Sequence, residues 1–165
     1  MTITESLLAE HAVLSAVFDQ VGTLLPKLGT VAEIKVLTRL VTGLLDGHGE
    51  TEKNLAYVAL DHVLEDKGQL DRMHQDHHEI DARLRRAQTA PTVEEARRLL
   101  AMALRASREH FRLEERAVFP VLEKALQGQT LGELGNAWMQ RYKPATPRRP
   151  APPADTIPVS VAACG

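Results

Sequence analysis

Two pairs of side chains in this sequence have the spacing of metal ligands on a helix. His48 is followed four positions later by Glu52, and His110 is followed four positions later by Glu114. Residues four apart lie on one face of an α-helix, so each imidazole would point with its carboxylate toward one place. Such nitrogen and oxygen ligands suit iron, manganese, zinc or copper. The chain has seven histidines and a single cysteine, Cys164, so thiolates cannot supply a metal site.

Single histidines elsewhere also fall on apolar stripes. His11 belongs to a stripe with the 4, 3, 4, 3 spacing of a bundle helix, formed by Leu7, His11, Leu14, Phe18, Val21, Leu25 and Leu28. A third segment contains three histidines, and His77 lies on its apolar face of Leu70, Met73, Ile80 and Leu84. His74 lies about 60° from His77, and His78 lies about 100° from it on the other side. Two ligand pairs are therefore open, His74 with His77 or His74 with His78, and the helical geometry favours His77.

The stripes of the second and fourth segments become polar at their histidine–glutamate pairs and then apolar again. The second contains Ile34, Leu37, Val41, Leu44, His48, Glu52, Leu55 and Ala59, and the fourth contains Leu99, Ala103, Ala106, His110, Glu114, Ala117 and Val121. Glu115 is a weaker alternative to Glu114, because it lies about 140° rather than about 40° from His110. His62 would lie about 21 Å along the helix from His48, too far to share its site.

A single histidine in such a stripe is more often a hydrogen-bonded core residue than a ligand. A buried polar side chain costs on the order of several kcal/mol unless it is paired or bound. Histidines in all four stripes, with two carboxylates, therefore indicate one shared metal site. About five histidines and two carboxylates are too many for one ion with open positions, and they predict two ions with the carboxylates bridging.

Four Ser/Thr-x-x-Glu patterns predict where helices begin. They start at Thr2, Thr30, Thr92 and Thr130, and the third helix is expected from about residue 67 or 68 to residue 87. We expect an all-α, up-down-up-down four-helix bundle in residues 1–142, including a short fifth helix over residues 131–142. Six prolines after Lys143 exclude regular helix or sheet, so residues 143–165 are expected to be a flexible, proline-rich tail.

Composition excludes several classes of protein. The 165 residues carry 20 Lys and Arg against 22 Asp and Glu, and this balance argues against nucleic-acid binding. No run of about 18 apolar residues predicts a membrane span. The beginning of the sequence lacks the features of a signal peptide, so a cytoplasmic protein is expected. One cysteine excludes a disulfide framework and an iron–sulfur cluster, and Gly-x-Ser-x-Gly and phosphate-loop motifs are absent.

The sequence resembles the hemerythrin-like, or HHE cation-binding, family over residues 3–126. The resemblance is carried by His11, by the two His-x-x-x-Glu pairs, by the third-helix segment MHQDHHEID and by HFRLEERAVFP from His110 to Pro120. The family's His-x-x-x-His spacing would select His74 and His78, whereas its pattern of His with Ile at +3 and Leu at +7 selects His77. The segment Ala56-Tyr57-Val58 departs from the family, which often has an aliphatic residue, Phe and Pro there.

The resemblance implies a hemerythrin-like bundle that holds two iron ions in an oxo- or hydroxo-bridged di-iron centre, with the carboxylates bridging and the histidines as terminal ligands. The implied ligands are His11, His48, Glu52, His74, His77 (or His78), His110 and Glu114. The expected function is binding of O2, or a response to peroxide or nitric oxide. Any enzymatic activity is expected to be redox chemistry rather than hydrolysis.

An alternative function is iron handling, or iron or redox sensing, that signals to a protein partner through the fifth helix or the tail. The partner is unknown from the sequence. The fifth helix carries a modest apolar face of Leu134, Trp138 and Met139, and capping of the bundle is its favoured role. A ferritin-like oxidase is disfavoured, because no histidine has a glutamate three residues before it, as the Glu-x-x-His pairs of such enzymes require.

Overall fold

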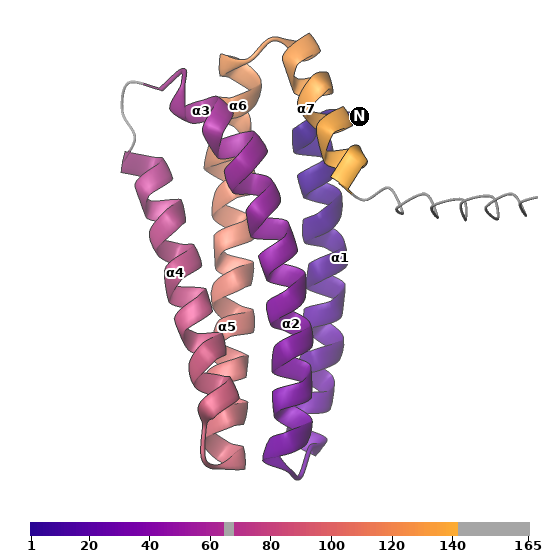
Figure 1. Ribbon diagram of the computed structural model, residues 1–165, viewed down its shortest axis with the longest axis vertical. Coiled ribbons are helices and arrows are strands. Elements are labelled where there is room, and N and C mark those ends of the chain that lie inside the picture. Colours follow the sequence, from indigo (N-terminus) through magenta and orange to yellow (C-terminus); the bar gives the residue numbers. More distant parts are fainter. Residues whose placement is uncertain (65–67, 142–165) are drawn as a thin grey trace, which may run out of the picture.

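The computed structural model describes residues 1–64 and 68–141. Four long helices lie side by side along one axis, as Figure 1 shows: α1 (Ile3–Leu24), α2 (Val31–Thr51), α4 (Gly68–Thr89) and α5 (Val93–Leu113). Each runs opposite to the one before it, so the predicted all-α, up-down-up-down bundle is confirmed. The described residues contain no strand. The predicted tail, residues 143–165, lies outside the described residues, as do Tyr142 and Cys164.

Threonine caps begin three of the helices. The Thr2 and Thr30 hydroxyls accept the backbone N–H groups of Glu5 and Glu33, whose carboxylates accept in return from the threonine N–H groups. Thr92 likewise accepts the N–H of Glu95 at the start of α5. These contacts satisfy N–H groups that have no partner inside the helix.

The short fifth helix begins earlier than predicted. Helix α7 (Gly128–Arg141) already includes Thr130, because the backbone N–H of Leu131 donates to the carbonyl of Gln127. Thr130 therefore lies inside the first turn of α7 and does not cap it.

The second and fourth helices each contain a π-helical segment that begins at a glutamate. The segment η2 (Glu52–Tyr57) joins α2 to α3 (Val58–Asp61), and η3 (Glu114–Val118) joins α5 to α6 (Phe119–Ala125). Hydrogen bonds in a π-helix run from residue i to residue i+5, so such a segment moves the following residues to a different side of the helix.

The two π segments explain an error in the predicted stripes. The predicted core positions Leu55, Ala59, Ala117 and Val121 are only partly buried. Positions one residue later are buried instead, together with their neighbours: Ala56, Tyr57, Leu60, Val118, Phe119 and Leu122. The prediction assumed the α-helical period throughout, whereas each π segment shifts it by one residue.

Leu44 was also expected in the core, but its side chain is 37% exposed. Thr38 is fully buried in the same helix instead, and its hydroxyl donates to the carbonyl of Ile34. The threonine can lie in the core because this local hydrogen bond satisfies its polar group.

Two apolar clusters fill the bundle on either side of a polar layer. One extends from Leu14 and Phe18 to Ile34, Leu99 and Phe111, and the other from Ile3 and Leu7 to Met73, Phe119 and Leu122. The short η1 (Leu25–Lys27) ends the first helix, where Arg97 donates to the carbonyls of Leu25 and Leu28. Within residues 1–64 and 68–141, no helix is long and apolar enough to cross a lipid bilayer.

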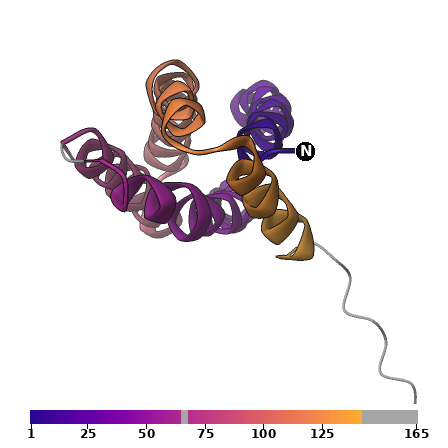
Figure 2. The ribbon, with the colours of Figure 1, turned by 90° about the horizontal axis from the view of Figure 1, so that it is seen from above.

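Helix α7 packs outside the four-helix bundle against the beginning of α1 (Figures 1 and 2). Gly135 makes this close approach possible, because a Cβ at this position would overlap the carbonyl oxygen of Met1 and come within 2.9 Å of the carbonyl carbon of Thr2. Gly132 lies one turn earlier and has open space around it. The two glycines therefore form a matched pair for testing how α7 is held.

We expect Gly135→Ala to destabilise the docking of α7 by about 1–3 kcal/mol, since the added methyl group meets backbone that must shift. Gly132→Ala should leave the docking unchanged or stabilise α7 by up to about 1 kcal/mol, because alanine has the higher helix propensity. Denaturant titrations followed by the fluorescence of Trp138, the sole tryptophan, measure both effects. Equal stabilities of the two variants would contradict the close approach.

Candidate metal centre

The bundle brings one histidine from each long helix to the same height. His11 and His77 are the ninth and tenth residues of α1 and α4, which run in one direction. His48 and His110 are the eighteenth residues of α2 and α5, which run in the other direction. Because neighbouring helices are antiparallel and of nearly equal length, these positions coincide along the bundle axis.

One group of potential ligands contains two histidines and two glutamates. The Nε2 atom of His48 is 2.8 Å from Oε1 of Glu52, and Nε2 of His11 is 3.5 Å from the same oxygen and 3.4 Å from Oε2 of Glu114. All four residues are buried, and these ligand atoms lie within 4.8 Å of one another. Two ligands at about 2.1 Å from one ion are roughly 3 to 3.5 Å apart, so the group has the size of a metal site.

A second group consists of Glu52, His77 and His110. The Nε2 atom of His77 is 3.2 Å from Oε2 of Glu52, while Oε1 of Glu52 faces the first group. Within the described residues, Glu52 is the only side chain common to both groups. Glu114 also lies between them, because its Oε2 is 3.4 Å from Nε2 of His11 and 3.6 Å from Nε2 of His110.

Outer carboxylates face the opposite nitrogens of three of these histidines. Nδ1 of His11 is 2.9 Å from Glu115, and Nδ1 of His48 is 2.8 Å from Glu10. The third carboxylate belongs to Asp76, 3.6 Å from Nδ1 of His110. A carboxylate at Nδ1 favours the tautomer with hydrogen on that nitrogen, and this leaves Nε2 free to bind a metal. Outer carboxylates of this kind are typical of histidines that ligate metals.

Several buried polar atoms at the centre lack a hydrogen-bonding partner among the described residues. They are both carboxylate oxygens of Glu52, Oε2 of Glu114, Nδ1 of His77 and both ring nitrogens of His110. Unpaired polar atoms are costly in a protein interior and therefore rare. Most of these atoms converge on the two ligand groups, so the donor set fits metal ions with nitrogen and oxygen ligands.

The buried carboxylates favour proton binding by two of the histidines when no metal is present. Burial alone would lower the pKa of His11, but the carboxylates of Glu114 and Glu52 close to its Nε2 outweigh burial and raise the pKa to about 9. Burial is likewise outweighed at His48, where mainly the charge of Glu52 raises the pKa to about 10. The pKa of Glu52 itself lies well below its usual range, because the charge of His48 and the nearby nitrogens of His11 and His77 outweigh burial.

The other side chains of the centre shift toward their neutral forms. Burial and the charge of Glu52 raise the pKa of Glu114 to about 8. Burial and the nearby His77 lower the pKa of His110 to about 3. The Nε2 atoms of His11 and His48 are 3.1 Å apart, so one of them must accept a hydrogen bond from the other. At neutral pH the metal-free centre therefore carries one extra proton on the His11–His48 pair, together with a protonated Glu114 and a neutral His110.

Metal binding at this centre should release protons. A ligating imidazole must be neutral and a ligating carboxylate ionised. The raised pKa values of His11 and His48, about 9 and about 10, keep one extra proton on this pair at neutral pH, and the pKa of about 8 keeps a second proton on Glu114. We expect Zn²⁺ uptake at pH 7 to release more than one proton per chain, and the affinity to rise from about pH 6 to pH 9 as protons compete less. Calorimetry in buffers with different ionisation enthalpies measures this release; binding heats that do not depend on the buffer would contradict it.

The side chains that surround the centre were not predicted from the sequence. The hydroxyl of Tyr57 donates to Oε1 of Glu114, and burial with the nearby carboxylates raises its pKa far above the usual range. Phe111 stacks on His11 with ring centroids 4.0 Å apart. Tyr57 was missed because, on an α-helix, it would lie about 140° from Glu52. In η2 the residue five positions along returns to the same face.

The remaining histidines lie outside both ligand groups. His74 is exposed, with its ring 5.4 Å from the ring of Tyr57 between centroids. His78 is exposed on α4, and His62 is exposed in the turn after α3. Of the three candidates on α4, the structure therefore brings only His77 to the other predicted ligands.

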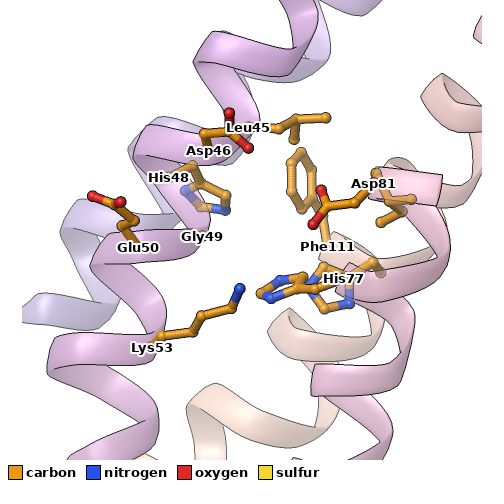
Figure 3. Close-up of a pocket in the computed structure, with 11 residues that line it drawn as sticks. Leu45, Asp46, His48, Gly49, Glu50, Lys53, His77, Asp81 and Phe111 are labelled. Carbon is orange, nitrogen blue, oxygen red and sulfur yellow. The ribbon is translucent and has the colours of Figure 1, made fainter. Parts of the chain in front are cut away.

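A pocket of about 270 Å3 leads from the surface to the second ligand group. It is lined by Leu45, Asp46, His48, Gly49, Glu50, Lys53, His77, Ile80, Asp81, His110 and Phe111. Figure 3 shows Lys53 and His77 pointing toward each other across this pocket. Its histidine-lined interior connects the candidate centre with solvent.

The comparisons with known proteins agree with this geometry. The sequence model of one family, described as the hemerythrin HHE cation binding domain, matches residues 2–122. No curated protein and no solved structure matches the chain. The matched region contains both ligand groups and ends before α7.

Proposed function

This chain belongs to the hemerythrin HHE cation-binding family, and we propose that it is a non-haem di-iron protein that binds O2 or responds to peroxide or nitric oxide. The observation that carries the proposal is the pair of ligand groups that share Glu52. His11 and His48 would hold one iron ion, and His77 and His110 would hold the other. Glu52 and Glu114 would bridge the two ions, since each lies between the groups.

The size of the pocket supports a small ligand. About 270 Å3 lined by three histidines accommodates O2, nitric oxide or peroxide next to the centre but not a large substrate buried in full. Two bound iron ions would supply redox chemistry and open positions for such a ligand.

Residues of the chain itself would control water and protons at the centre. Phe111 covers His11, and apolar clusters close the bundle above and below, so bulk water is excluded on those sides. Tyr57 provides a buried hydroxyl hydrogen on Oε1 of Glu114. Lys53 places a cationic amine near the pocket, which favours ligands that carry or develop negative charge.

Anaerobic reconstitution with Fe(II), followed by exposure to O2, tests the function. We expect two iron ions per chain after removal of unbound metal, and near-UV or visible absorption that appears when O2 is admitted. The same protein loaded with Zn²⁺ is the control, because Zn²⁺ has no redox chemistry. Iron content near zero, or an unchanged spectrum of the iron-loaded protein, would contradict the proposal.

Iron or redox sensing is a second candidate function, favoured by one observation. Trp138 of α7 donates to Glu10, which in turn contacts His48, so a helix outside the matched domain is connected to the centre. Sensing predicts that loading with iron changes the rate of proteolysis in or after α7, or changes the oligomeric state. Identical proteolysis and oligomeric state with and without iron would favour simple ligand binding.

A further inference from the structure

Helix α7 lies beyond the matched domain, yet one of its side chains reaches a contact of the candidate centre. The indole Nε1 of Trp138 donates to Oε1 of Glu10 over 2.9 Å. The other oxygen of Glu10, Oε2, is 2.8 Å from Nδ1 of His48. A continuous path of two contacts therefore joins α7 to a histidine of the first ligand group.

The path constrains the histidine chemically. A carboxylate only accepts hydrogen bonds when ionised, so Nδ1 of His48 must carry the hydrogen in the contact with Glu10. Nε2 of His48 then faces Oε1 of Glu52 at 2.8 Å, at the position where a metal would bind. The carboxylate can hold this geometry only if it keeps its own orientation, and the indole N–H fixes its second oxygen.

The position of α7 is itself well determined. Gly135 lies against the backbone of Met1 and Thr2. At the end of the helix, Arg141 pairs with Glu50 at 3.2 Å and also donates to its backbone carbonyl. Helix α7 is thereby held at one point to the start of α1 and at another to Glu50 of α2, which lies between His48 and Glu52 in the sequence. Figure 2 shows α7 next to α1 and α2.

We propose that Trp138 is a positioning residue of the metal centre, which acts through Glu10 on the tautomer and orientation of His48. This inference rests on the proposed function in one respect, namely that His48 is a metal ligand. A helix that only covered the apolar end of the bundle would need ring packing from Trp138 but not its N–H. Removal of the indole N–H should therefore disturb His48 if Trp138 is a positioning residue, and should leave His48 unchanged if Trp138 only covers the bundle.

The test compares Trp138→Phe, which keeps an aromatic ring but removes the N–H, with Met139→Leu on the exposed side of the same helix. Nitrogen-15 NMR of histidine-labelled protein measures the tautomer of His48 in the Zn²⁺-loaded state and the hydrogen bond of its Nδ1–H to Glu10 in the metal-free state. Competition with a chelator measures Zn²⁺ affinity. We expect Trp138→Phe to shift the His48 ring nitrogens toward a mixture of tautomers and to weaken Zn²⁺ binding about tenfold, the lower end for outer partners of a ligand.

Met139→Leu should leave both measurements unchanged. Glu10→Gln should have a larger effect than Trp138→Phe, about 10- to 100-fold in affinity. The two donors contact different oxygens of Glu10, and an amide places a donating NH2 group at one of these two positions. Suppose that the wild-type chain binds Zn²⁺. A folded Trp138→Phe variant that keeps either the wild-type tautomer of His48 or the wild-type Zn²⁺ affinity would then overturn the proposal. A wild-type chain without affinity for Zn²⁺ or iron would overturn the proposed function. The Nδ1 signal of His48 in the metal-free protein, which reports its hydrogen bond to Glu10, would then decide the role of Trp138 alone.

A measurement on the unmodified chain decides the question if Trp138→Phe does not fold. Trp138 is the only tryptophan, and Zn²⁺ has a filled d shell without redox chemistry, so an emission change reports a change around this one indole. We expect the emission to change in proportion to Zn²⁺ uptake and to stop changing when the centre is full. Emission that stays constant during Zn²⁺ uptake would overturn the proposal.

Discussion

The Glu52→Gln variant should lose metal from both ligand groups at once. Glu52 offers Oε1 to His48 and His11 and Oε2 to His77. An amide replaces one of these oxygens with an NH2 group, which cannot bind a cation, and removes the negative charge that the two ions would share. Loss of an outer partner of a ligand costs about 10- to 100-fold in metal affinity, so loss of this shared ligand should cost more than about 100-fold.

Metal content per chain after gel filtration measures the effect, and circular dichroism checks that the helices remain. Glu79→Gln is the matched control, because Glu79 is exposed on α4 and pairs with Arg83 at the surface. The control should bind metal like the unmodified chain. Two ions retained by folded Glu52→Gln would show that this carboxylate is not the shared ligand.

The three histidines of α4 should differ sharply in their importance. The side chain of His77 is 11% exposed, with Nε2 3.2 Å from Glu52, whereas His74 and His78 are exposed. We expect His77→Ala to lose one of the two ions, because His110 would be the only histidine left beside the shared carboxylates of Glu52 and Glu114 at the second position. The first group should keep its ion, since His11 and His48 are unchanged.

His74→Ala and His78→Ala are the natural controls, and both should retain two ions per chain. Metal analysis together with the optical spectrum of the iron-loaded protein separates the three variants. If His74→Ala lost metal as strongly as His77→Ala, both histidines would be ligands, as the sequence analysis expected for His74. If only His78→Ala lost metal, α4 would present a different face to the centre.

Most of the fold could be predicted because its determinants are local. Thr2, Thr30 and Thr92 cap helices through contacts within three residues along the chain. The helical period of apolar residues predicts one buried face for each helix. The same period identified His11, His48, Glu52, His110 and Glu114, and the antiparallel bundle brings them together.

The α-helical period failed where the backbone departs from it. After Glu52 and after Glu114 the buried positions move by one residue, so Tyr57 enters the centre and Leu55 does not. Pro120 lies near the start of α6, directly after η3. A proline lacks the N–H that an α-helix interior requires, so Pro120 is a local indication of irregular hydrogen bonding. No proline follows Glu52 in η2 or α3, so the sequence has no such indication there.

The seven histidines and the spacing of two glutamates by themselves determined that the chain has a nitrogen- and oxygen-rich polar layer inside four helices. Only the tertiary structure decided which atoms meet there. The contacts of Glu115 with His11, of Glu10 with His48, and of Trp138 with Glu10 join positions on different helices. These contacts form only when the packed helices have a particular rotation and relative height. The helical period of apolar residues within one helix gives no information about either quantity.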